Sequence, residues 1–281
     1  MGESPPVVLT IAGFDPSSGA GITADIKTIA AHGCYGVACI TALTVQSTSA
    51  VRRVEPLEAG LVSETLDELA ADFEIAAVHI GMLGSGGVAK AVADFLANSK
   101  PKISNVVLDP VLKSSSGAAL LDLKGAKILT DKLIPLSHVL TPNVDEAAAL
   151  TGLEVQDVEG MKAAASRLLE MGARAVVITG GHLDKAIDLL SFQNEKGVQH
   201  EVFRAERLQS NSTHGTGCAF STAIACHLAL NRGLAEATLL AKTYVSAAIA
   251  SAQPLGRGVG PVHHLYRREQ RRRAAGSGDE T

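Results

Sequence analysis

Apolar, β-branched runs alternate with helical patterns along most of the chain. Such runs predict buried strands at 7–12, 36–41, 76–82, 105–110, 137–142 and 173–181. Between them, apolar positions recur at helical spacing in 20–32, 58–72, 86–98 and 159–171. Gly33 and Gly172 stand where two of these helices should end, because glycine readily stops a helix. The alternation predicts a mainly parallel sheet with helices on both faces.

The pattern changes towards the C-terminus. Two strand-like runs at 186–192 and 198–205 flank the turn sequence NEKG, which predicts an antiparallel hairpin. Two apolar helices are expected after it, at about 216–230 and 234–252. No Ser/Pro-rich linker, repeat or low-complexity block divides the chain. One domain is therefore expected over 1–281, with a basic, frayed tail from about 267.

Composition narrows the class of protein. The chain has 281 residues, of which 46% are hydrophobic, so it can bury a large core. No apolar run approaches the roughly 18 to 20 residues of a membrane helix, and the start MGESPPVVLTIAG lacks the features of a secretory signal. The four cysteines, at 34, 39, 218 and 226, have no CxxC spacing and are expected to be reduced thiols. These features favour a cytoplasmic protein without a membrane partner.

Charge argues against a nucleic-acid partner. The net charge is -4, so no broad basic surface is expected. The chain has one basic cluster, close to its C-terminus: Arg267, Arg268, Arg271, Arg272 and Arg273. A solvated helix end followed by a frayed tail explains this cluster better than nucleic-acid binding does.

The stretch STHGTGCAFS places two glycines directly before a predicted apolar helix. Such a backbone can aim successive N–H groups at one point, and the helix dipole adds partial positive charge there. This arrangement suits a phosphate, or the charge on a phosphoryl group during transfer. Cys218 would lie in the first turn, where a lowered thiol pKa is expected, and could accept a hydroxyl proton. On this stretch alone, a glycine-rich cap with a packed cysteine is an equally good interpretation.

Two common nucleotide motifs are absent or incomplete. The chain contains no GxxxxGK[ST], which excludes a P-loop. The run GSGG at 84–87 precedes a predicted helix but lacks the GxGxxG spacing of a dinucleotide-binding turn.

Polar residues follow several of the predicted strands. Asp109 closes one strand, and Asn143 and Glu146 lie at the start of a helix after the next. The carboxyl ends of parallel strands meet at one edge of a sheet, where α/β proteins bind ligands. Mg²⁺ prefers one or two carboxylates completed by water and substrate phosphates, so Asp109 and Glu146 are candidate metal ligands. Glu146 can equally be an ordinary first-turn acid that complements the helix dipole.

Eight motifs occur in a fixed order across nearly the whole chain: AGFDPSSGAGITADIKT (12–28), ITALTVQST (40–48), IGML (80–83), VLDPV (107–111), TPNVDEAAAL (141–150), GGHL (180–183), STHGTGCAFS (212–221) and GVGPVHH (258–264). This series resembles the hydroxymethylpyrimidine/phosphomethylpyrimidine kinases of thiamine biosynthesis, members of the ribokinase-like superfamily. The resemblance implies a three-layer α/β/α ribokinase-like fold, a homodimer, ATP as co-substrate and Mg²⁺. The implied reaction phosphorylates 4-amino-5-hydroxymethyl-2-methylpyrimidine and then its monophosphate.

The resemblance also implies roles for single residues. Gly215, Thr216 and Gly217 would form an anion hole beside Cys218, the candidate base. Gln46 would read the pyrimidine, because its amide offers a donor and an acceptor in one plane. Without the resemblance, Gln46 would be assigned to a loop and Met82 to the core.

The remaining roles concern the rest of the substrate and the nucleotide. Asp25 and the backbone of Gly13 would hold the hydroxymethyl side, and Met82 would supply an apolar wall. Asn143 would touch the ATP phosphates, while Asp109 and Glu146 would occupy the magnesium region. Thr179 would lie at the nucleotide, although many family members have lysine there, so ATP affinity or its metal dependence is expected to differ. Phe14 and Ser18 replace a common serine and glycine at the substrate lip.

Three other functions compete with this interpretation. Pyridoxal kinase is the nearest, because related proteins phosphorylate the hydroxymethyl group of pyridoxine-like rings. A catalytically silent pyrimidine-binding protein on the same fold is the second, and substrate-dependent ADP release distinguishes it. A dinucleotide oxidoreductase is the third and would require binding of NAD.

Overall fold

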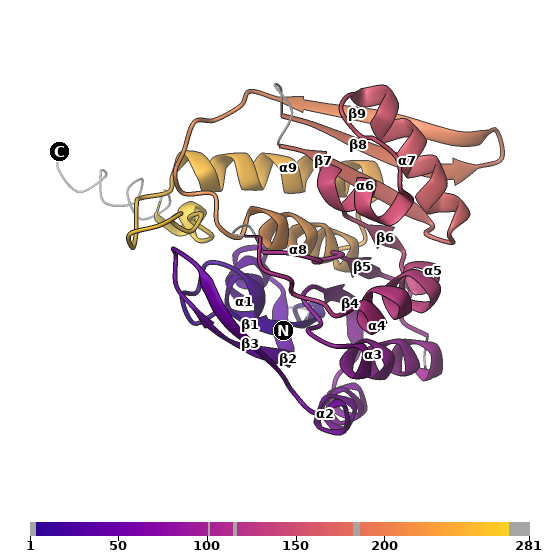
Figure 1. The fold of residues 1–281 in the computed structure, drawn as a ribbon, viewed down its shortest axis with the longest axis vertical. Coiled ribbons are helices and arrows are strands. Elements are labelled where there is room, and N and C mark those ends of the chain that lie inside the picture. The colour runs from indigo at the N-terminus through magenta and orange to yellow at the C-terminus, as the bar shows by residue number, and fades with distance from the viewer. Residues whose placement is uncertain (1–3, 101, 115–116, 182–185, 270–281) are drawn as a thin grey trace.

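The computed structural model describes residues 4–100, 102–114, 117–181 and 186–269. Within these residues nine strands form one sheet, in the order β3-β2-β1-β4-β5-β6-β7-β8-β9 (Figure 1). The strands are β1 (Val7–Phe14), β2 (Tyr35–Gln46), β3 (Val51–Pro56), β4 (Ile75–Ile80), β5 (Val106–Leu108), β6 (Val139–Leu140), β7 (Ala175–Gly180), β8 (Ala186–Asn194) and β9 (Gly197–Ala205). The helices are α1 (Gly21–Ala31), α2 (Ala59–Asp72), α3 (Gly86–Asn98), α4 (Leu123–Ile128), η1 (Leu129–Leu133), α5 (Ile134–Leu136), α6 (Val144–Thr151), α7 (Val158–Glu170), α8 (Thr216–Ala229) and α9 (Leu234–Ala250).

The middle of the sheet is parallel. Strands β2, β1, β4, β5, β6 and β7 pair in parallel, whereas β3 at one edge and β8 and β9 at the other are antiparallel. The predicted parallel sheet and the C-terminal hairpin are therefore confirmed. The two strands that lead to the metal-site motifs are much shorter than predicted, since β5 has 3 residues and β6 only 2.

Helices cover both faces of the sheet, as predicted. Alternation along β1 sends Leu9 and Ile11 into a core shared with α2, α3 and α7, while Val8 points into a second core with α8 and α9. The three-layer α/β/α architecture follows from this alternation. None of the helices in the described ranges has the length and apolar character needed to cross a bilayer.

Two further regions differ from the sequence prediction. Strand β2 continues to Gln46 and pairs with β3, which was not predicted, so Gln46 lies at a strand end and not in a loop. The prediction stopped early because polar Thr44 and Gln46 interrupt the apolar run, although alternation with Leu43 and Val45 is compatible with a half-exposed strand. The second region is 123–136, where α4, η1 and α5 form helical turns that were not predicted.

The carboxyl ends of the parallel strands lie in one row. Backbone N–H groups just beyond the strands bond to the neighbouring strand end: Gly81 to Ile11 O at 2.9 Å, Asp109 to Ile80 O at 2.8 Å, Thr141 to Leu108 O at 2.9 Å and Thr179 to Pro142 O at 2.9 Å. Helix α8 packs against β1, β4 and β5 on one face. The motifs that follow the strands are thereby gathered at one edge.

A buried ion pair joins α9 to the antiparallel part of the sheet. Lys242 Nζ lies 2.6 Å from Asp188 Oδ2, and the two residues are only 8% and 6% exposed. The other carboxylate oxygen of Asp188 accepts a hydrogen bond from Gly180 N at 3.2 Å. The pair therefore ties α9 to the end of β7.

Removing one partner of this pair should destabilise the fold. We expect Lys242→Met to lower the free energy of unfolding by about 3–5 kcal/mol, because it leaves a buried carboxylate without its cation. Adding Asp188→Asn should recover much of that loss. Urea denaturation of both single variants and the double variant checks this, and strictly additive losses would contradict it.

Candidate active site

Two loops touch where β1 ends and α8 begins. Gly215 has a left-handed backbone (φ 82°), and a Cβ atom added to it would lie 1.8 Å from the carbonyl oxygen of Gly19. A Cβ on Gly19 would lie 2.2 Å from Cδ2 of His214. Because any side chain at these positions would collide with backbone or ring atoms, the close approach depends on glycine at both. The motifs around residues 19 and 215 thus form one structure.

Asp15 holds these two loops together. Its carboxylate accepts hydrogen bonds from Ser17 N at 2.8 Å, Ala20 N at 3.0 Å and His214 Nε2 at 2.8 Å. Burial alone would raise the pKa of Asp15, but the hydrogen bonds from His214, Ser17 and Ala20 outweigh burial and lower it. Sequence reasoning did not single out Asp15 or His214, although both lie inside quoted motifs.

Gln46 reaches the same place from the end of β2. Its Nε2 lies 3.4 Å from His214 Nε2, and its Oε1 accepts from Thr44 Oγ1 at 3.2 Å. His214 itself is fixed by the 258–264 motif, since His214 N donates to Gly260 O at 3.0 Å. The glutamine expected to read the ring and the glycine turn expected to bind phosphate therefore share one site.

Gly13 and Met82 lie side by side, as expected for neighbours in a substrate site. A Cβ on Gly13 would approach Met82 Sδ to 3.0 Å. The backbone of Met82 is fixed by Thr41, whose hydroxyl donates to Met82 O at 2.5 Å. Gly21 (φ 59°) folds the loop back onto β1, where its Cβ would lie 2.2 Å from Gly13 O.

The first turn of α8 offers backbone donors beside a carboxylate. Gly215 is the N-cap, and the first regular helical bond runs from Ala219 N to Gly215 O at 2.9 Å. The N–H groups of Gly217 and Cys218 therefore have no i−4 partner within the helix. A Cβ on Gly217 would lie 3.7 Å from Asp109 Oδ2. An anion held by this turn would lie next to the carboxyl end of β5.

The expected lowering of the Cys218 thiol pKa is wrong. Burial and the charges of Asp25 and Asp109 raise that pKa well above its ordinary value, despite a hydrogen bond from the backbone of Gly21. The helix dipole is therefore outweighed by desolvation and nearby carboxylates. The thiol is protonated in the free protein.

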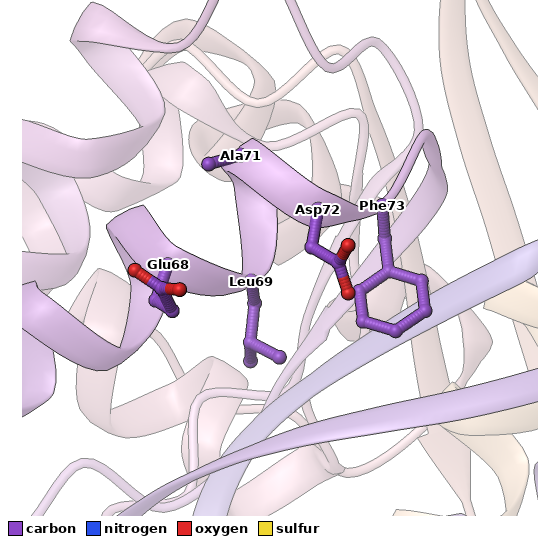
Figure 2. Close-up of a pocket in the computed structure, with 5 residues that line it drawn as sticks. All are labelled: Glu68, Leu69, Ala71, Asp72 and Phe73. Atoms are coloured by element: carbon purple, nitrogen blue, oxygen red, sulfur yellow. The ribbon is translucent and has the colours of Figure 1, made fainter.

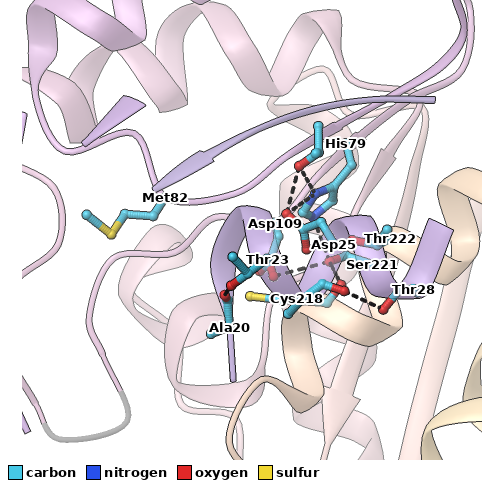
Figure 3. Close-up of polar contacts among 12 residues, drawn as sticks. Ala20, Thr23, Asp25, Thr28, His79, Met82, Asp109, Cys218, Ser221 and Thr222 are labelled. Atoms are coloured by element: carbon cyan, nitrogen blue, oxygen red, sulfur yellow. Dashed lines mark hydrogen bonds and ion pairs between the residues drawn. The ribbon is translucent and has the colours of Figure 1, made fainter. Parts of the chain in front are cut away.

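Asp25 lies beneath this turn, enclosed by protein groups (Figure 3). It is fully buried, and it accepts from Thr10 Oγ1 at 2.7 Å and from Thr222 Oγ1 at 2.9 Å. His79 Nδ1 lies 3.3 Å from the same carboxylate. The expected contact between Asp25 and the hydroxymethyl group stays a prediction, because both carboxylate oxygens already have protein partners.

Asp109 and Glu146 provide the negative charge of the expected metal region. Burial raises the pKa of Asp109 to about 6. Burial and the charge of Asp109 raise the pKa of Glu146 to about 8. The charge effect shows that the two carboxylates interact unfavourably when both are ionised, and a divalent cation would relieve this repulsion.

The donor set fits magnesium better than a metal held by protein alone. Among the described residues no group of three or more His, Cys, Asp or Glu side chains could hold a metal ion. Two carboxylates, completed by water and phosphate oxygens, would match the preference of Mg²⁺. Glu146 also has a structural role, because it forms a capping box with Asn143: Asn143 N donates to Glu146 Oε2 at 3.0 Å, and Glu146 N to Asn143 Oδ1 at 2.9 Å.

The two expected nucleotide residues are neighbours at the ends of β6 and β7. Asn143 and Thr179 form an isolated parallel bridge, and Thr179 N donates to Pro142 O at 2.9 Å. The run at 84–87 is explained differently: Ser85 caps α3, and Gly86 N donates to Asp122 Oδ2 at 3.2 Å. Residues 84–87 therefore cap α3. This role agrees with the absence of the full GxGxxG spacing of a dinucleotide-binding turn.

Two surface hollows lie away from this cluster. One, of about 410 Å³, is lined by Glu68, Leu69, Ala71, Asp72 and Phe73 at the end of α2 (Figure 2). The other, of about 390 Å³, lies near His138 and Arg174 at the opposite edge of the sheet. Neither contains any of the residues described above.

Two solved structures with this fold are kinases of small molecules. The Bacillus subtilis pyridoxal kinase, solved as an ADP complex, superposes with a TM-score of 0.85 at 33% identity, covering 95% of this chain and 100% of that one. The phosphomethylpyrimidine kinase of Clostridium difficile gives 0.76 at 36% identity, covering 87% and 99%. The fold and the gathered site thus define a phosphotransferase with a three-layer α/β/α architecture.

Sequence comparison identifies the family within this class. The model of the phosphomethylpyrimidine kinase family matches residues 15–263. The hydroxymethylpyrimidine/phosphomethylpyrimidine kinase of Haemophilus influenzae is 40% identical over 92% of this chain and 96% of its own length. A thiamine biosynthesis bifunctional protein of Geobacter sulfurreducens is 42% identical, and the chain spans 53% of that longer protein. The chain belongs to the phosphomethylpyrimidine kinase family, as its eight motifs predicted.

The raised carboxyl pKa values predict how stability depends on pH. Asp109 and Glu146 titrate near 4 when unfolded but at about 6 and 8 when folded. The folded state therefore keeps protons that the unfolded state has lost, and stability without metal should fall as the pH rises from about 4 to 8. Glu146→Gln should flatten the upper part of this decline, as measured by urea denaturation with a chelator present. Exposed Glu154→Gln is the matched control, and an unchanged slope in Glu146→Gln would contradict the assignment.

Proposed function

We propose that the protein transfers the γ-phosphoryl group of ATP to 4-amino-5-hydroxymethyl-2-methylpyrimidine and then to the resulting monophosphate. The observation that carries this proposal is the meeting of Gln46 with the glycine turn before α8, through the 3.4 Å approach of Gln46 to His214. A ring-reading amide and a phosphate-binding turn in one site are what such a kinase requires. Family membership and full-length similarity to named kinases of this substrate support it.

The acceptor is recognised by Gln46 with Gly13 and Met82. The amide of Gln46 has only long contacts with the protein, at 3.2 and 3.4 Å, so its donor and acceptor can pair with a ring nitrogen and the neighbouring amine. Met82 supplies an apolar surface beside the backbone of Gly13. A planar heterocycle bound here would form hydrogen bonds with Gln46 along its edge and would pack against Met82 with its face.

The transferred group is stabilised by Gly215, Thr216, Gly217 and Cys218 at the start of α8. The N–H groups of Gly217 and Cys218, which have no i−4 partner within the helix, and the helix dipole stabilise charge on the phosphoryl group as it moves. Asn143 and Thr179, at the ends of neighbouring strands, face the remainder of the nucleotide. Thr179 cannot neutralise a phosphate as a lysine would, so ATP binding relies more strongly on the other groups.

Mg²⁺ would be held by Asp109 and Glu146, mainly through water. When bound, it would neutralise phosphate charge and orient the phosphates for transfer. The capping box orients the Glu146 carboxylate from within α6. The carboxylates otherwise remain partly protonated, which disfavours metal binding at low pH.

Pyridoxal kinase is the second candidate function. The superposition on Bacillus subtilis pyridoxal kinase, with a TM-score of 0.85, favours keeping it. The two acceptors share a ring that bears a hydroxymethyl group. They differ in the amine that Gln46 would pair with, so the aminopyrimidine is preferred.

We further propose a cytoplasmic homodimer. Leu43 and Val45, on the strand that carries Gln46, are 46% and 49% exposed, and a second copy could cover them. The four cysteines are free thiols, as expected in a reducing compartment. Sedimentation analysis of the purified protein tests the dimer.

One assay decides between the candidate functions. The protein is incubated with ATP, Mg²⁺ and either hydroxymethylpyrimidine or pyridoxal, and mono- and diphosphate products are separated. Pyrimidine diphosphate is the expected product. Binding of the pyrimidine without ADP release would show a silent binder, and phosphorylation of pyridoxal alone would establish the second candidate.

Replacing the ring-reading amide should weaken acceptor binding. Gln46→Leu keeps the size of the side chain but leaves the polar edge of the ring unpaired, which should cost about 1–3 kcal/mol. Calorimetric titration with the pyrimidine measures the loss, and the same substitution at exposed Gln193 on β8, Gln193→Leu, serves as the control. Unchanged affinity in Gln46→Leu would show that another residue reads the ring.

Loss of the thiol should affect the two phosphorylations differently. The first acceptor is a neutral hydroxyl that must lose a proton, whereas the second is a phosphate oxygen that is already ionised. Only the minor thiolate form of Cys218 can accept that proton, so we expect Cys218→Ala to slow the first step about 10- to 100-fold and the second step much less. The steps are measured separately, by starting from the alcohol and from the monophosphate. Equal losses in both would exclude this role.

A further inference from the structure

His79 is a fully buried histidine between two buried carboxylates, near the first turn of α8 (Figure 3). Both ring nitrogens have polar partners. Nδ1 lies 3.3 Å from Asp25 Oδ2 and 3.3 Å from Thr10 Oγ1, while Nε2 lies 2.9 Å from Ser221 Oγ. Ser221 in turn lies 3.3 Å from Asp109 Oδ2. The His79 ring therefore lies between Asp25, which is expected to face the substrate, and Asp109, which is expected to face the metal.

The hydrogen bonds on one side of the ring require a proton on Nδ1. Asp25 can only accept when it is ionised, and the hydroxyl of Thr10 already donates its single proton to Asp25 Oδ2 at 2.7 Å. Thr10 Oγ1 can therefore only accept from the ring. Both neighbours of Nδ1 are acceptors, so this nitrogen is the donor.

The hydrogen bonds around Nε2 of His79 favour a second proton on the ring, at this nitrogen. The single hydroxyl proton of Ser221 has three acceptors within reach: Gly217 O at 3.0 Å, Cys218 O at 3.2 Å and Asp109 Oδ2. If Ser221 donates to any of them, Nε2 must donate to Ser221. An imidazolium satisfies every partner, and a neutral ring with its proton on Nδ1 does not.

Electrostatics agrees with this count of protons. Burial alone would lower the pKa of His79, but the charge of Asp25, the hydrogen bond to it and the charge of Asp109 raise it above its ordinary value. Asp25 and Asp109 are 0% and 6% exposed, so solvent screens their charges little. A cation between them offsets the repulsion of the two acids.

We propose that His79 is a positioning residue for phosphoryl transfer, a buried cation that holds Asp25 and, through Ser221, Asp109 and the first turn of α8 in one arrangement. This role rests on the proposed function, because it concerns the geometry of that site. The contacts join β1, α1, β4, β5 and α8, since Thr10, Asp25, His79, Asp109 and Ser221 each come from, or directly follow, one of them. Without the cation, the repelling acids would shift Asp109 relative to the donors of Gly217 and Cys218.

Kinetics of two variants at the same position test the proposal. His79→Gln keeps a hydrogen-bonding side chain without charge, whereas His79→Lys keeps a cation that can donate to Asp25 and Ser221. We expect His79→Gln to lower kcat about 10- to 100-fold, with a smaller change in KM for the pyrimidine, because small displacements of reacting groups are costly. The Mg²⁺ concentration for half-maximal rate should rise, and His79→Lys should recover much of the lost kcat. His200→Gln, on β9 away from the site, is the matched control.

Three outcomes would overturn the role of His79. One is an unchanged kcat and Mg²⁺ requirement in His79→Gln. The second is a His79→Lys variant no better than His79→Gln, with both shown to be folded by circular dichroism. If His79→Gln does not fold, Ser221→Ala replaces it in the test. This variant removes the hydroxyl that links His79 to Asp109 but keeps the imidazole ring. Unchanged kinetics in Ser221→Ala would again overturn the role of His79.

The third outcome comes from nuclear magnetic resonance of the unaltered protein with isotope-labelled histidine nitrogens. The expected result at neutral pH is two protonated ring nitrogens in His79, a signal that disappears in His79→Gln, or His79→Asn if the former does not fold. A neutral ring would overturn the proposal. This readout needs no activity, so a charged His79 in a protein that phosphorylates nothing would refute the function alone, and a neutral His79 in an active kinase would refute only the inference.

Discussion

The close approach of two backbone segments organises the whole site. The loop after β1 and the loop before α8 touch at Gly19 and Gly215, where a Cβ atom on Gly215 would lie within 1.8 Å of a carbonyl oxygen. Asp15 and His214 then lock the contact with a 2.8 Å hydrogen bond. Every other element of the site is placed relative to this contact: Gln46 meets His214 from β2, and the first turn of α8 meets Asp109 at the end of β5. A protein with side chains at these two glycines could build the same sheet but not the same site.

Buried charge is the second constraint on this site. Asp109 and Glu146 lie where desolvation opposes ionisation, and their pKa values are raised accordingly, while Asp25 lies fully buried nearby. A site designed only for stability would avoid such a cluster. Its presence is explained by compensating positive charge, from His79 next to Asp25 in the free protein and from a divalent cation at Asp109 and Glu146 in the bound state. The same desolvation keeps the Cys218 thiol protonated, which argues that transfer relies on positioned donors more than on a strong base.

Ser18 and Thr179, which are expected to depart from the family pattern, each have defined partners in the structure. Ser18 has a left-handed backbone (φ 62°), which costs a non-glycine residue about 1 kcal/mol, and hydrogen bonds from Ser18 N to Asp15 O and from Lys27 Nζ to Ser18 O hold it there. Thr179 pairs directly with Asp188 across β7 and β8, and Asp188 is bound by Lys242. Lys242 therefore places a positive charge at this end of the sheet. It comes from α9 and not from β7, and it is paired with Asp188.

The sequence by itself determined the architecture and the family. The alternation of strand and helix patterns, the C-terminal hairpin and the ordered motifs depend on local periodicity and on short runs of residues, and the structure and the comparisons agree with them. Local patterns missed β3 and the extension of β2 to Gln46, because a half-exposed strand with Thr44 and Gln46 has no continuous apolar run. They also missed Asp15, His79 and Ser221, since single polar residues within apolar or glycine-rich motifs carry no signal of their partners.

Only the tertiary structure decided how the chemistry is tuned. A cysteine in the first turn of a helix should have a lowered pKa by local rules, yet three carboxylates from distant parts of the chain and burial reverse the direction. Likewise, His79 is an ordinary strand residue until Asp25, Thr10 and Ser221 surround it. Desolvation and charge act through space over a few ångströms, and His79 and Ser221, 142 positions apart along the chain, become neighbours only when the layers pack.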